Sequence, residues 1–289
     1  MIIPIYLMDG NQFQKWLKHT KRNTLIMGIL NVTPDSFSDG GKFIHLGKAL
    51  SQAQSMEKNG ADIIDIGGES TRPGATPVSL EEEINRTIPV IEAIRKFSKI
   101  SISIDTYKSE VAEKALLAGA DFINDISGLT FDSRMIGIVK KFDVPVVLMH
   151  IKGTPRNMQT NPTYIDVIKE LLDFFSLQIQ KALDFGIKKE QIIIDPGIGF
   201  GKQLNDNFIL IQRLKEFSGL GFPILIGPSR KSFIGLTLDV PSGDRLEGTL
   251  ASISASILNG ASIVRVHDVK EVKRAVVITD KIMEAGTQA

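Results

Sequence analysis

The repeating unit of this chain is plainest at residues 60–68, which read Gly60-Ala61-Asp62-Ile63-Ile64-Asp65-Ile66-Gly67-Gly68. A helical stretch precedes this segment, and its apolar residues fall on both alternating faces, as in a strand that is buried on both sides. The same turn returns as Gly119-Ala120-Asp121 and as Gly260-Ala261-Ser262, each time before another β-branched run. A turn that is used three times in this way indicates an array of one repeated helix-and-strand module.

The chain contains eight such runs, at residues 24–32, 62–68, 101–106, 122–127, 145–150, 192–197, 223–227 and 262–267. Their first residues lie on average about 34 residues apart, which is the length of one strand plus one helix. Eight units of this kind predict an α/β fold, a single (β/α)8 TIM barrel. An open doubly wound sheet is the competing architecture, but no Gly-x-Gly-x-x-Gly motif follows the first run.

The first residues do not belong to this array. Phe13, Trp16 and Leu17 have helical spacing in a stretch that precedes the first β-branched run. We expect residues 1–23 to form a short N-terminal extension that caps the barrel, and residues 24–289 to form the barrel itself.

Composition excludes several classes of protein. The chain has 289 residues, and its 34 basic and 33 acidic side chains leave a net charge of +1. Nucleic-acid-binding proteins usually carry a one-sided positive excess, so we expect no nucleic-acid partner. The absence of cysteine excludes disulfide scaffolds, iron–sulfur clusters and thiol nucleophiles. Because the sequence shows neither a signal peptide nor an apolar run of roughly 18 residues, we expect a cytoplasmic protein with no membrane partner.

Polar residues gather at the carboxyl ends of the predicted strands, where barrel enzymes hold their active sites. Asp105, Asn124 and Asp195 end the third, fourth and sixth strands and are expected to converge on one cavity. Their oxygens suit a flat heterocycle that offers several N–H donors along one edge, and Lys231 can donate to a carbonyl oxygen of the same ring. For Asp105, an N-cap of the following helix is an equally good interpretation.

The opposite rim of the predicted barrel is basic. Arg265 and His267 lie two residues apart on the last strand, so their side chains leave the strand on the same face. As a pair of cations beside Asn31, which follows the first strand, they predict a phosphate site. The alternatives are a salt bridge across the barrel mouth for Arg265 and a hydrogen-bonded core imidazole for His267.

Two long connections, at residues 31–41 and 67–77, are rich in Gly and Pro. Loops of this length within a compact barrel are usually lids or binding loops. An exposed Phe37 on the first loop is unfavourable unless it closes over a ligand. We therefore expect both loops to cover the site.

Seven blocks of this sequence, in register, resemble dihydropteroate synthase. They span residues 28–41, 65–74, 103–106, 124–128, 195–202, 229–233 and 265–268, and the fifth reads Asp195-Pro196-Gly197-Ile198-Gly199-Phe200-Gly201-Lys202. The resemblance runs from about residue 24 to the end of the chain. It implies a transferase of folate biosynthesis that condenses 6-hydroxymethyl-7,8-dihydropterin diphosphate with 4-aminobenzoate, with the help of Mg²⁺, to give 7,8-dihydropteroate and diphosphate.

The resemblance also implies roles for individual positions. The residues implied to hold the pterin are Asp105, Asn124, Asp195 and Lys231, with Ile126, Met149 and Gly227 as further substrate contacts. Those implied to hold the diphosphate and Mg²⁺ are Arg265, His267 and, as the metal ligand, Asn31. Those implied to line the aminobenzoate site are Thr71, Arg72, Pro73, Phe200, Ser232 and Phe37. Of these, Asp105, Lys231, Arg265 and His267 are expected to take part in catalysis.

The expected reaction is an SN1-like displacement, in which diphosphate leaves first and Asp105 stabilises the resulting cation. One alternative is a pterin-binding methyltransferase that acts on methyltetrahydrofolate and a corrinoid protein. A second is a non-catalytic pterin-binding paralogue, and a third is an aldolase-type barrel, which needs a strand lysine that none of the eight runs contains. We also expect a homodimer, because barrels with exposed apolar helices often dimerise, and an aminobenzoate site that is sensitive to sulfonamides.

Overall fold

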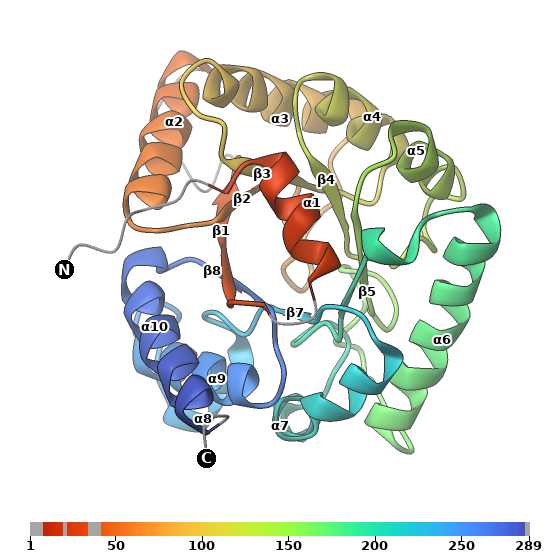
Figure 1. Cartoon of the computed structure of the whole chain (residues 1–289), viewed down its shortest axis with the longest axis vertical. Helices are drawn as coiled ribbons and strands as arrows, with labels where there is room; N and C mark the ends of the chain where they lie inside the picture. The colour runs from red at the N-terminus through yellow and green to blue at the C-terminus, as the bar shows by residue number, and fades with distance from the viewer. Residues whose placement is uncertain (1–7, 20–21, 34–41, 287–289) are drawn as a thin grey trace.

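Eight parallel strands form the ring at the centre of Figure 1. The computed structural model describes residues 8–19, 22–33 and 42–286. The strands are β1 (Leu25–Asn31), β2 (Ile63–Gly67), β3 (Ser101–Asp105), β4 (Phe122–Asp125), β5 (Val146–Met149), β6 (Ile192–Asp195), β7 (Leu225–Ile226) and β8 (Ile263–Val266). Neighbours pair in the order β6-β5-β4-β3-β2-β1-β8-β7, and a bridge between Ile194 and Ile224 joins the two ends of this order. The predicted (β/α)8 barrel is confirmed.

The outer layer consists of helices that follow the strands in turn (Figure 1). The α-helices are α1 (Gly10–Lys18), α2 (Lys42–Lys58), α3 (Leu80–Arg95), α4 (Ser109–Leu117), α5 (Met135–Phe142), α6 (Val167–Phe185), α7 (Leu204–Gln212), α8 (Ser232–Leu238), α9 (Leu246–Leu258) and α10 (Val269–Gly286), and the 3-10 helices are η2 (Lys189–Gln191) and η3 (Leu214–Leu220). None of the described helices is long and apolar enough to cross a membrane.

Helix ends follow the signals in the sequence. Ser79 caps α3 by accepting a hydrogen bond from the backbone N–H of Glu82. At the other end of a module, Gly186 closes α6 with a φ of 94°, a left-handed conformation that glycine adopts without a steric penalty. Each helix thus ends where the next strand begins, at the amino-terminal end of the barrel.

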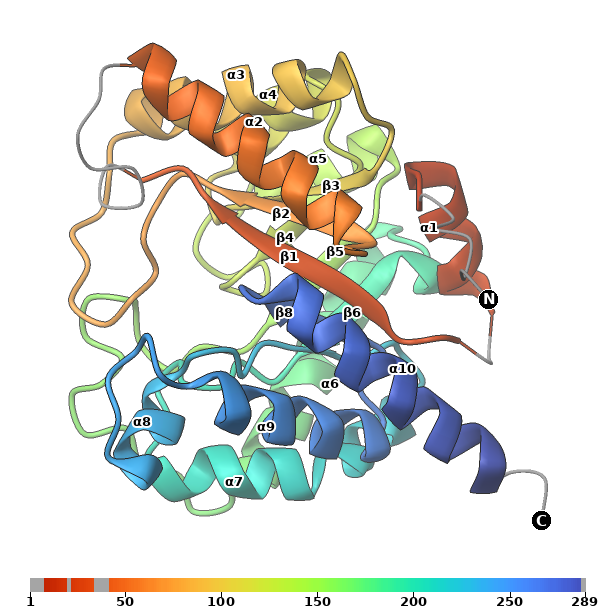
Figure 2. The ribbon, with the colours of Figure 1, turned by 90° about the vertical axis from the view of Figure 1, so that its left-hand side faces the viewer.

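Helix α1 lies across the amino-terminal end of the barrel, and the connection between β2 and α3 lies at the opposite end (Figure 2). Phe13, Trp16 and Leu17 are buried in a cluster with side chains from the strands. The rings of Phe13 and Phe122 stack with their centroids 4.6 Å apart. This apolar plug fills the lower layer of the barrel and leaves the carboxyl ends of the strands for polar side chains. The division of the chain between residues 23 and 24 stays a prediction.

We expect Phe13→Ala to lower the free energy of unfolding by about 3–5 kcal/mol, because Phe13 is fully buried and its removal leaves a cavity under the barrel. Urea denaturation monitored by circular dichroism measures this change. The matched control is Phe97→Ala, since the Phe97 side chain is 43% exposed and its loss creates no cavity. Equal destabilisation by the two variants would contradict the role of α1 as a plug.

Candidate active site

A pocket opens at the carboxyl ends of the strands, where barrel enzymes hold their active sites. Its lining residues come from nearly every part of the barrel: Thr71, Asp105, Asn124, Ile126, Met149, Asp195, Gly197, Ile198, Phe200, Gly227, Lys231 and Arg265. Most of the residues expected from the sequence therefore lie around one cavity. The pocket also includes Gly197 and Ile198, which the sequence did not single out.

Strand register explains why residues so far apart in sequence meet here. Asn31 is paired with Gly67, Gly67 with Asp105, and Asp105 with Asn124, so the four occupy one level around the barrel mouth. On the far side, Met149 is paired with Asp195. Each of these residues is the last or second-to-last of its strand, where the side chains of a closed barrel point toward a common space.

The organising side chain of this site is Asp65, which the sequence analysis did not single out as functional. The Asp65 carboxylate is fully buried, and it accepts hydrogen bonds from Ser103 Oγ at 2.6 Å and from Asn124 Nδ2 at 3.2 Å. Arg265 Nε donates to Asp65 Oδ2 at 2.6 Å. The signal available in the sequence was a charged residue in the middle of a β-branched run, since such a buried charge requires a partner.

Arg265 also donates from Nη2 to Asp105 Oδ2 at 2.6 Å. The salt bridge considered as an alternative for Arg265 is thus present, whereas the N-cap interpretation of Asp105 is wrong. The N-terminus of α4 is instead held by Asp132, whose carboxylate accepts from the backbone N–H of Ser109 at 3.0 Å. Asp105 lines the pocket instead, since residues 106–108 separate the end of its strand from the start of that helix.

Asp105 retains one carboxylate oxygen for a ligand. Its Oδ1 is buried and has no hydrogen-bond partner among the described residues, which is costly unless a bound molecule supplies a donor. Burial raises the pKa of Asp105 to about 7, although the charge of Arg265 opposes this shift. Asp65 and Asp105 in turn hold the pKa of Arg265 above its ordinary value, against the effect of burial.

Asp195, on β6, faces the same cavity. Its Oδ1 accepts from the backbone N–H of Gly197 at 2.7 Å, which fixes the carboxylate at the start of the following loop. Gly197 has a φ of 69°, and a Cβ there would lie 2.1 Å from the carbonyl oxygen of His150, so only glycine fits this turn. Burial raises the pKa of Asp195 to about 6.

Lys231 lies at the start of α8, with its ammonium 4.0 Å from the centroid of the Phe200 ring. Burial, together with the nearby charge of Arg265, lowers the pKa of Lys231 to about 8. Several titratable groups with pKa values displaced toward neutrality in one cavity are typical of an active site.

His267 does not behave as the second cation that the sequence suggested. Burial lowers the pKa of His267 to about 3, with further contributions from the charges of Arg265 and Arg230. Its Nδ1 lies 3.0 Å from Ser229 Oγ, and its backbone N–H donates to the same hydroxyl oxygen. The structure therefore favours the alternative interpretation of His267, a hydrogen-bonded core imidazole, over a second cation beside Arg265.

The remaining expected residues lie at the rim or beyond it. Thr71 reaches the pocket, whereas Arg72 and Pro73 are exposed on the same loop. Ser232 is exposed in the first turn of α8. Phe37 lies outside the described residues.

One edge of the pocket, beside Gly67, carries oxygen atoms that could hold a cation. No cluster of three His, Cys, Asp or Glu side chains suited to a metal occurs within the described ranges. However, a Cβ built on Gly67 would lie 3.6 Å from Asn31 Oδ1 and 3.5 Å from Asp105 Oδ2, so both oxygens border the space that this glycine leaves. Mg²⁺ prefers oxygen ligands and commonly takes only one or two from the protein, with phosphate oxygens and water supplying the rest. Asn31 Oδ1 is the oxygen here that fits Mg²⁺, because Asp105 Oδ2 already accepts from Arg265 Nη2.

Comparison with known proteins agrees with this geometry. A family model described as pterin binding enzyme matches residues 27–267. A dihydropteroate synthase of Synechocystis is 52% identical over 262 residues, which cover 90% of this chain and 91% of the relative. The chain belongs to the dihydropteroate synthase family. Members of this family are transferases of folate biosynthesis, so the methyltransferase and aldolase alternatives are not supported.

Solved structures give the same result. A Yersinia pestis dihydropteroate synthase, determined as a sulfonamide drug complex, is 44% identical and has a TM-score of 0.86, with 91% of this chain and 95% of that chain covered. A Clostridium difficile dihydropteroate synthase, determined in the presence of pteroic acid, is 48% identical and also has a TM-score of 0.86, with 92% and 98% covered.

We expect Asp65→Asn to cost about 3 kcal/mol of folding free energy, because it removes one of the two carboxylates that form ion pairs with the buried Arg265 within the described residues. Thermal or urea unfolding measures the change. Asp143→Asn, which breaks the exposed pair with Lys188, is the matched control and should cost about 1 kcal/mol or less. A neutral effect of Asp65→Asn would show that Asp65 does not organise the site.

Proposed function

We propose that this pocket binds the pterin diphosphate through its carboxylates and Arg265, and 4-aminobenzoate through the loop that carries Thr71. The observation that carries the proposal is the buried, unpartnered Oδ1 of Asp105 in the same cavity as Asp195 and Lys231. The Clostridium difficile relative supports it, since the pteroic acid with which it was determined contains both a pterin and an aminobenzoate group.

The pterin ring is proposed to lie between the two sides of the barrel. Asp105 Oδ1 and the carboxylate of Asp195 accept from its N–H groups, while Asn124 supplies an amide that Asp65 already orients. Lys231 donates to the ring carbonyl oxygen. Ile126 and Met149, which are buried beside Phe200 in one small apolar cluster, provide contacts to the ring face.

The diphosphate is proposed to lie at the Arg265 edge of the pocket. Arg265 uses Nε and Nη2 for its two carboxylate partners, and Nη1 has no hydrogen-bond partner among the described residues. A phosphate oxygen can accept from this group, and His267 can add a hydrogen bond from its neutral ring. Asn31 is the protein ligand that would hold Mg²⁺ beside the diphosphate. When bound, Mg²⁺ would neutralise charge that builds up on the leaving group.

The reaction is proposed to be an SN1-like displacement. The bond between the exocyclic methylene carbon and the diphosphate oxygen breaks, and the electron pair leaves with the diphosphate. The ionised Asp105 carboxylate stabilises the cation that remains on the methylene and the ring, because the interaction takes place in a buried site. The amino nitrogen of 4-aminobenzoate then forms the new C–N bond and loses a proton to solvent, so no strong general base is needed.

Diphosphate release tests this function directly. We expect the purified chain to release diphosphate from the pterin substrate only when 4-aminobenzoate and Mg²⁺ are both present, with stoichiometric formation of dihydropteroate. A coupled diphosphate assay and product chromatography measure the two products. If the chain binds the pterin but forms no dihydropteroate, it is the non-catalytic paralogue.

We expect Asp105→Asn to lower turnover by about 100-fold or more while it weakens diphosphate binding much less, since the lost charge acts on the transition state. Because burial raises the pKa of Asp105 to about 7, the ionised form accumulates as pH rises, and wild-type turnover should rise through this range. The variant should lack this rise. Steady-state kinetics between pH 5.5 and 8.5 would check both effects, and unchanged turnover would remove Asp105 from catalysis.

The homodimer and the cytoplasmic location stay predictions. The dimer is supported by an apolar face along α9 and α10, where Leu258, Ile278 and Ile282 are each more than half exposed. A surface of this kind on paired helices is typical of contacts between subunits.

A further inference from the structure

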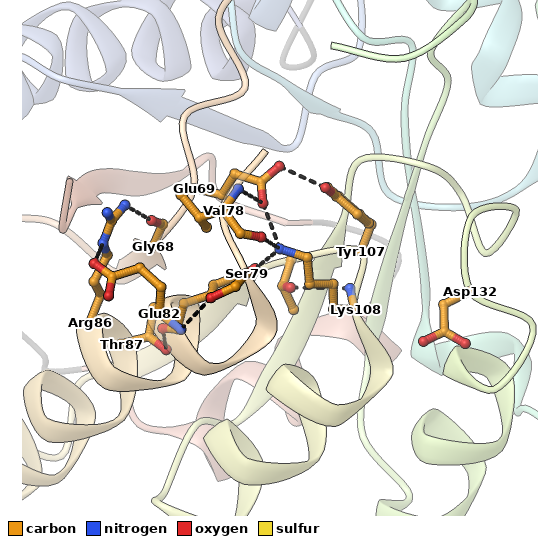
Figure 3. A network of polar contacts seen from close by, with 12 residues as sticks. Gly68, Glu69, Val78, Ser79, Glu82, Arg86, Thr87, Tyr107, Lys108 and Asp132 are labelled. Atoms are coloured by element: carbon orange, nitrogen blue, oxygen red, sulfur yellow. Dashed lines mark hydrogen bonds and ion pairs between the residues drawn. The ribbon is translucent and has the colours of Figure 1, made fainter. Parts of the chain in front are cut away.

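The loop between β2 and α3 has its two ends joined by a single ammonium group. Lys108 Nζ donates to Glu69 Oε2 at 2.6 Å, where the loop begins, and to the backbone carbonyl oxygen of Val78 at 2.8 Å, where it ends. The third donor of Lys108 goes to Glu83 Oε2 at 2.6 Å, in the first turns of α3. An ammonium has three donors, so Lys108 is fully used by these contacts (Figure 3).

Glu69 joins the same two ends independently. Its Oε2 accepts from the backbone N–H of Val78 at 3.3 Å, and its Oε1 accepts from the hydroxyl of Tyr107 at 2.7 Å. Glu69 and Glu83 are 8% and 1% exposed, so two carboxylates are held in the interior by one lysine. We call these four side chains, Glu69, Glu83, Tyr107 and Lys108, the loop clamp.

The loop clamp is built on rigid elements. Arg86, on α3, donates to the carbonyl oxygen of Gly68 at 2.8 Å. A Cβ on Gly68 would lie 2.8 Å from Thr87 Cγ2, so the end of β2 is packed directly against α3. Because Glu83 lies on α3 and Tyr107 and Lys108 immediately precede α4, the loop is anchored to the barrel wall.

Beyond the clamp, the loop makes few hydrogen bonds to the other described residues. Thr71 lines the pocket, Arg72 and Pro73 are exposed, and the backbone N–H of Gly74 donates to the carbonyl oxygen of Pro155 at 3.1 Å. Arg72 lies near enough to Lys231 for its charge to contribute to the lowered pKa of that lysine. The position of Thr71 at the pocket wall therefore depends on where the clamp holds residues 69 and 78.

We propose that Lys108 is a positioning residue for the second substrate: by fastening Glu69 and Val78 to α3, it sets the loop at the aminobenzoate side of the pocket. The proposal rests on the proposed function, which assigns that side to 4-aminobenzoate. Neither Lys108 nor its partners line the pocket, so their effect reaches the substrate only through the loop. Holding the loop ends together removes conformational freedom that aminobenzoate binding would otherwise have to remove.

The test variant must not leave two buried carboxylates without a cation between them. Lys108→Met by itself would leave two buried carboxylates facing each other, which is strongly destabilising. The double variant Lys108→Met/Glu83→Gln removes one charge of each sign and leaves Glu69 with its hydrogen bonds from Tyr107 and Val78. The matched control is Lys141→Met/Glu113→Gln, which removes a lysine–glutamate pair of 2.5 Å between α5 and α4, away from the loop.

We expect the double variant to raise KM for 4-aminobenzoate about tenfold while the affinity for the pterin diphosphate, measured by calorimetry, changes less than twofold. Hydrogen exchange should become faster at the backbone N–H groups of residues 70–76, and the control should match the wild type in every measurement. The single variant Lys108→Arg, which keeps the charge and the donors, should have most of the wild-type affinity for 4-aminobenzoate. Tyr107→Phe, which removes one bond of the clamp and no charge, should give a smaller change in the same direction.

An unchanged KM for 4-aminobenzoate in the folded double variant would overturn the proposal, as would an equal loss of affinity for both substrates. If the double variant does not fold, Tyr107→Phe tests the proposal instead, through KM for 4-aminobenzoate and the affinity for the pterin diphosphate. Hydrogen exchange requires no turnover, so slow exchange at residues 70–76 in the variant would reject the clamp. Failure of the proposed function would appear separately, as a wild-type chain that forms no dihydropteroate.

Discussion

The ion pair between Asp65 and Arg265 is the interaction on which the polar end of this barrel depends. Asp65 lies on β2 and Arg265 on β8, so the pair crosses β1 and fixes three strands at the level of the pocket. A fully buried carboxylate is tolerated only with a charge partner and further hydrogen bonds, and Ser103 and Asn124 supply these. The apolar plug on the amino-terminal side leaves this layer free for such a network.

The same pair sets the electrostatics of the site. Arg265 is shared between Asp65 and Asp105, so Asp105 receives only part of the compensation that a buried carboxylate needs. Its pKa is consequently raised, and Oδ1 keeps an unused acceptor. Burial lowers the pKa of His267 and Lys231, and the neighbouring charge of Arg265 lowers both further. A ligand that brings N–H donors to the carboxylates and negative charge to Arg265 relieves both imbalances.

A shared cation recurs at the loop between β2 and α3, where Lys108 serves two carboxylates. The two arrangements differ in what they hold. Arg265 joins strands at the centre of the barrel, whereas Lys108 joins the two ends of a loop to the helices outside it. The first fixes the charged groups of the pocket, and the second fixes the two ends of the loop. Under the proposed function, binding of the heterocycle and binding of its partner molecule depend on separate polar networks.

The amino-acid sequence by itself determined the barrel, because turns such as Gly60-Ala61-Asp62 and β-branched runs are local signals that repeat along the chain. It also placed Asp105, Asn124 and Asp195 at one rim, since strand ends of a parallel barrel coincide. Only the tertiary structure showed that Asp65 organises the site, because its partner Arg265 lies 200 residues away. It alone decided between the cap and the ion pair for Asp105, and it alone showed the burial that lowers the pKa of His267. Charge and pKa depend on burial and on neighbours from distant strands, and no local pattern of residues encodes these.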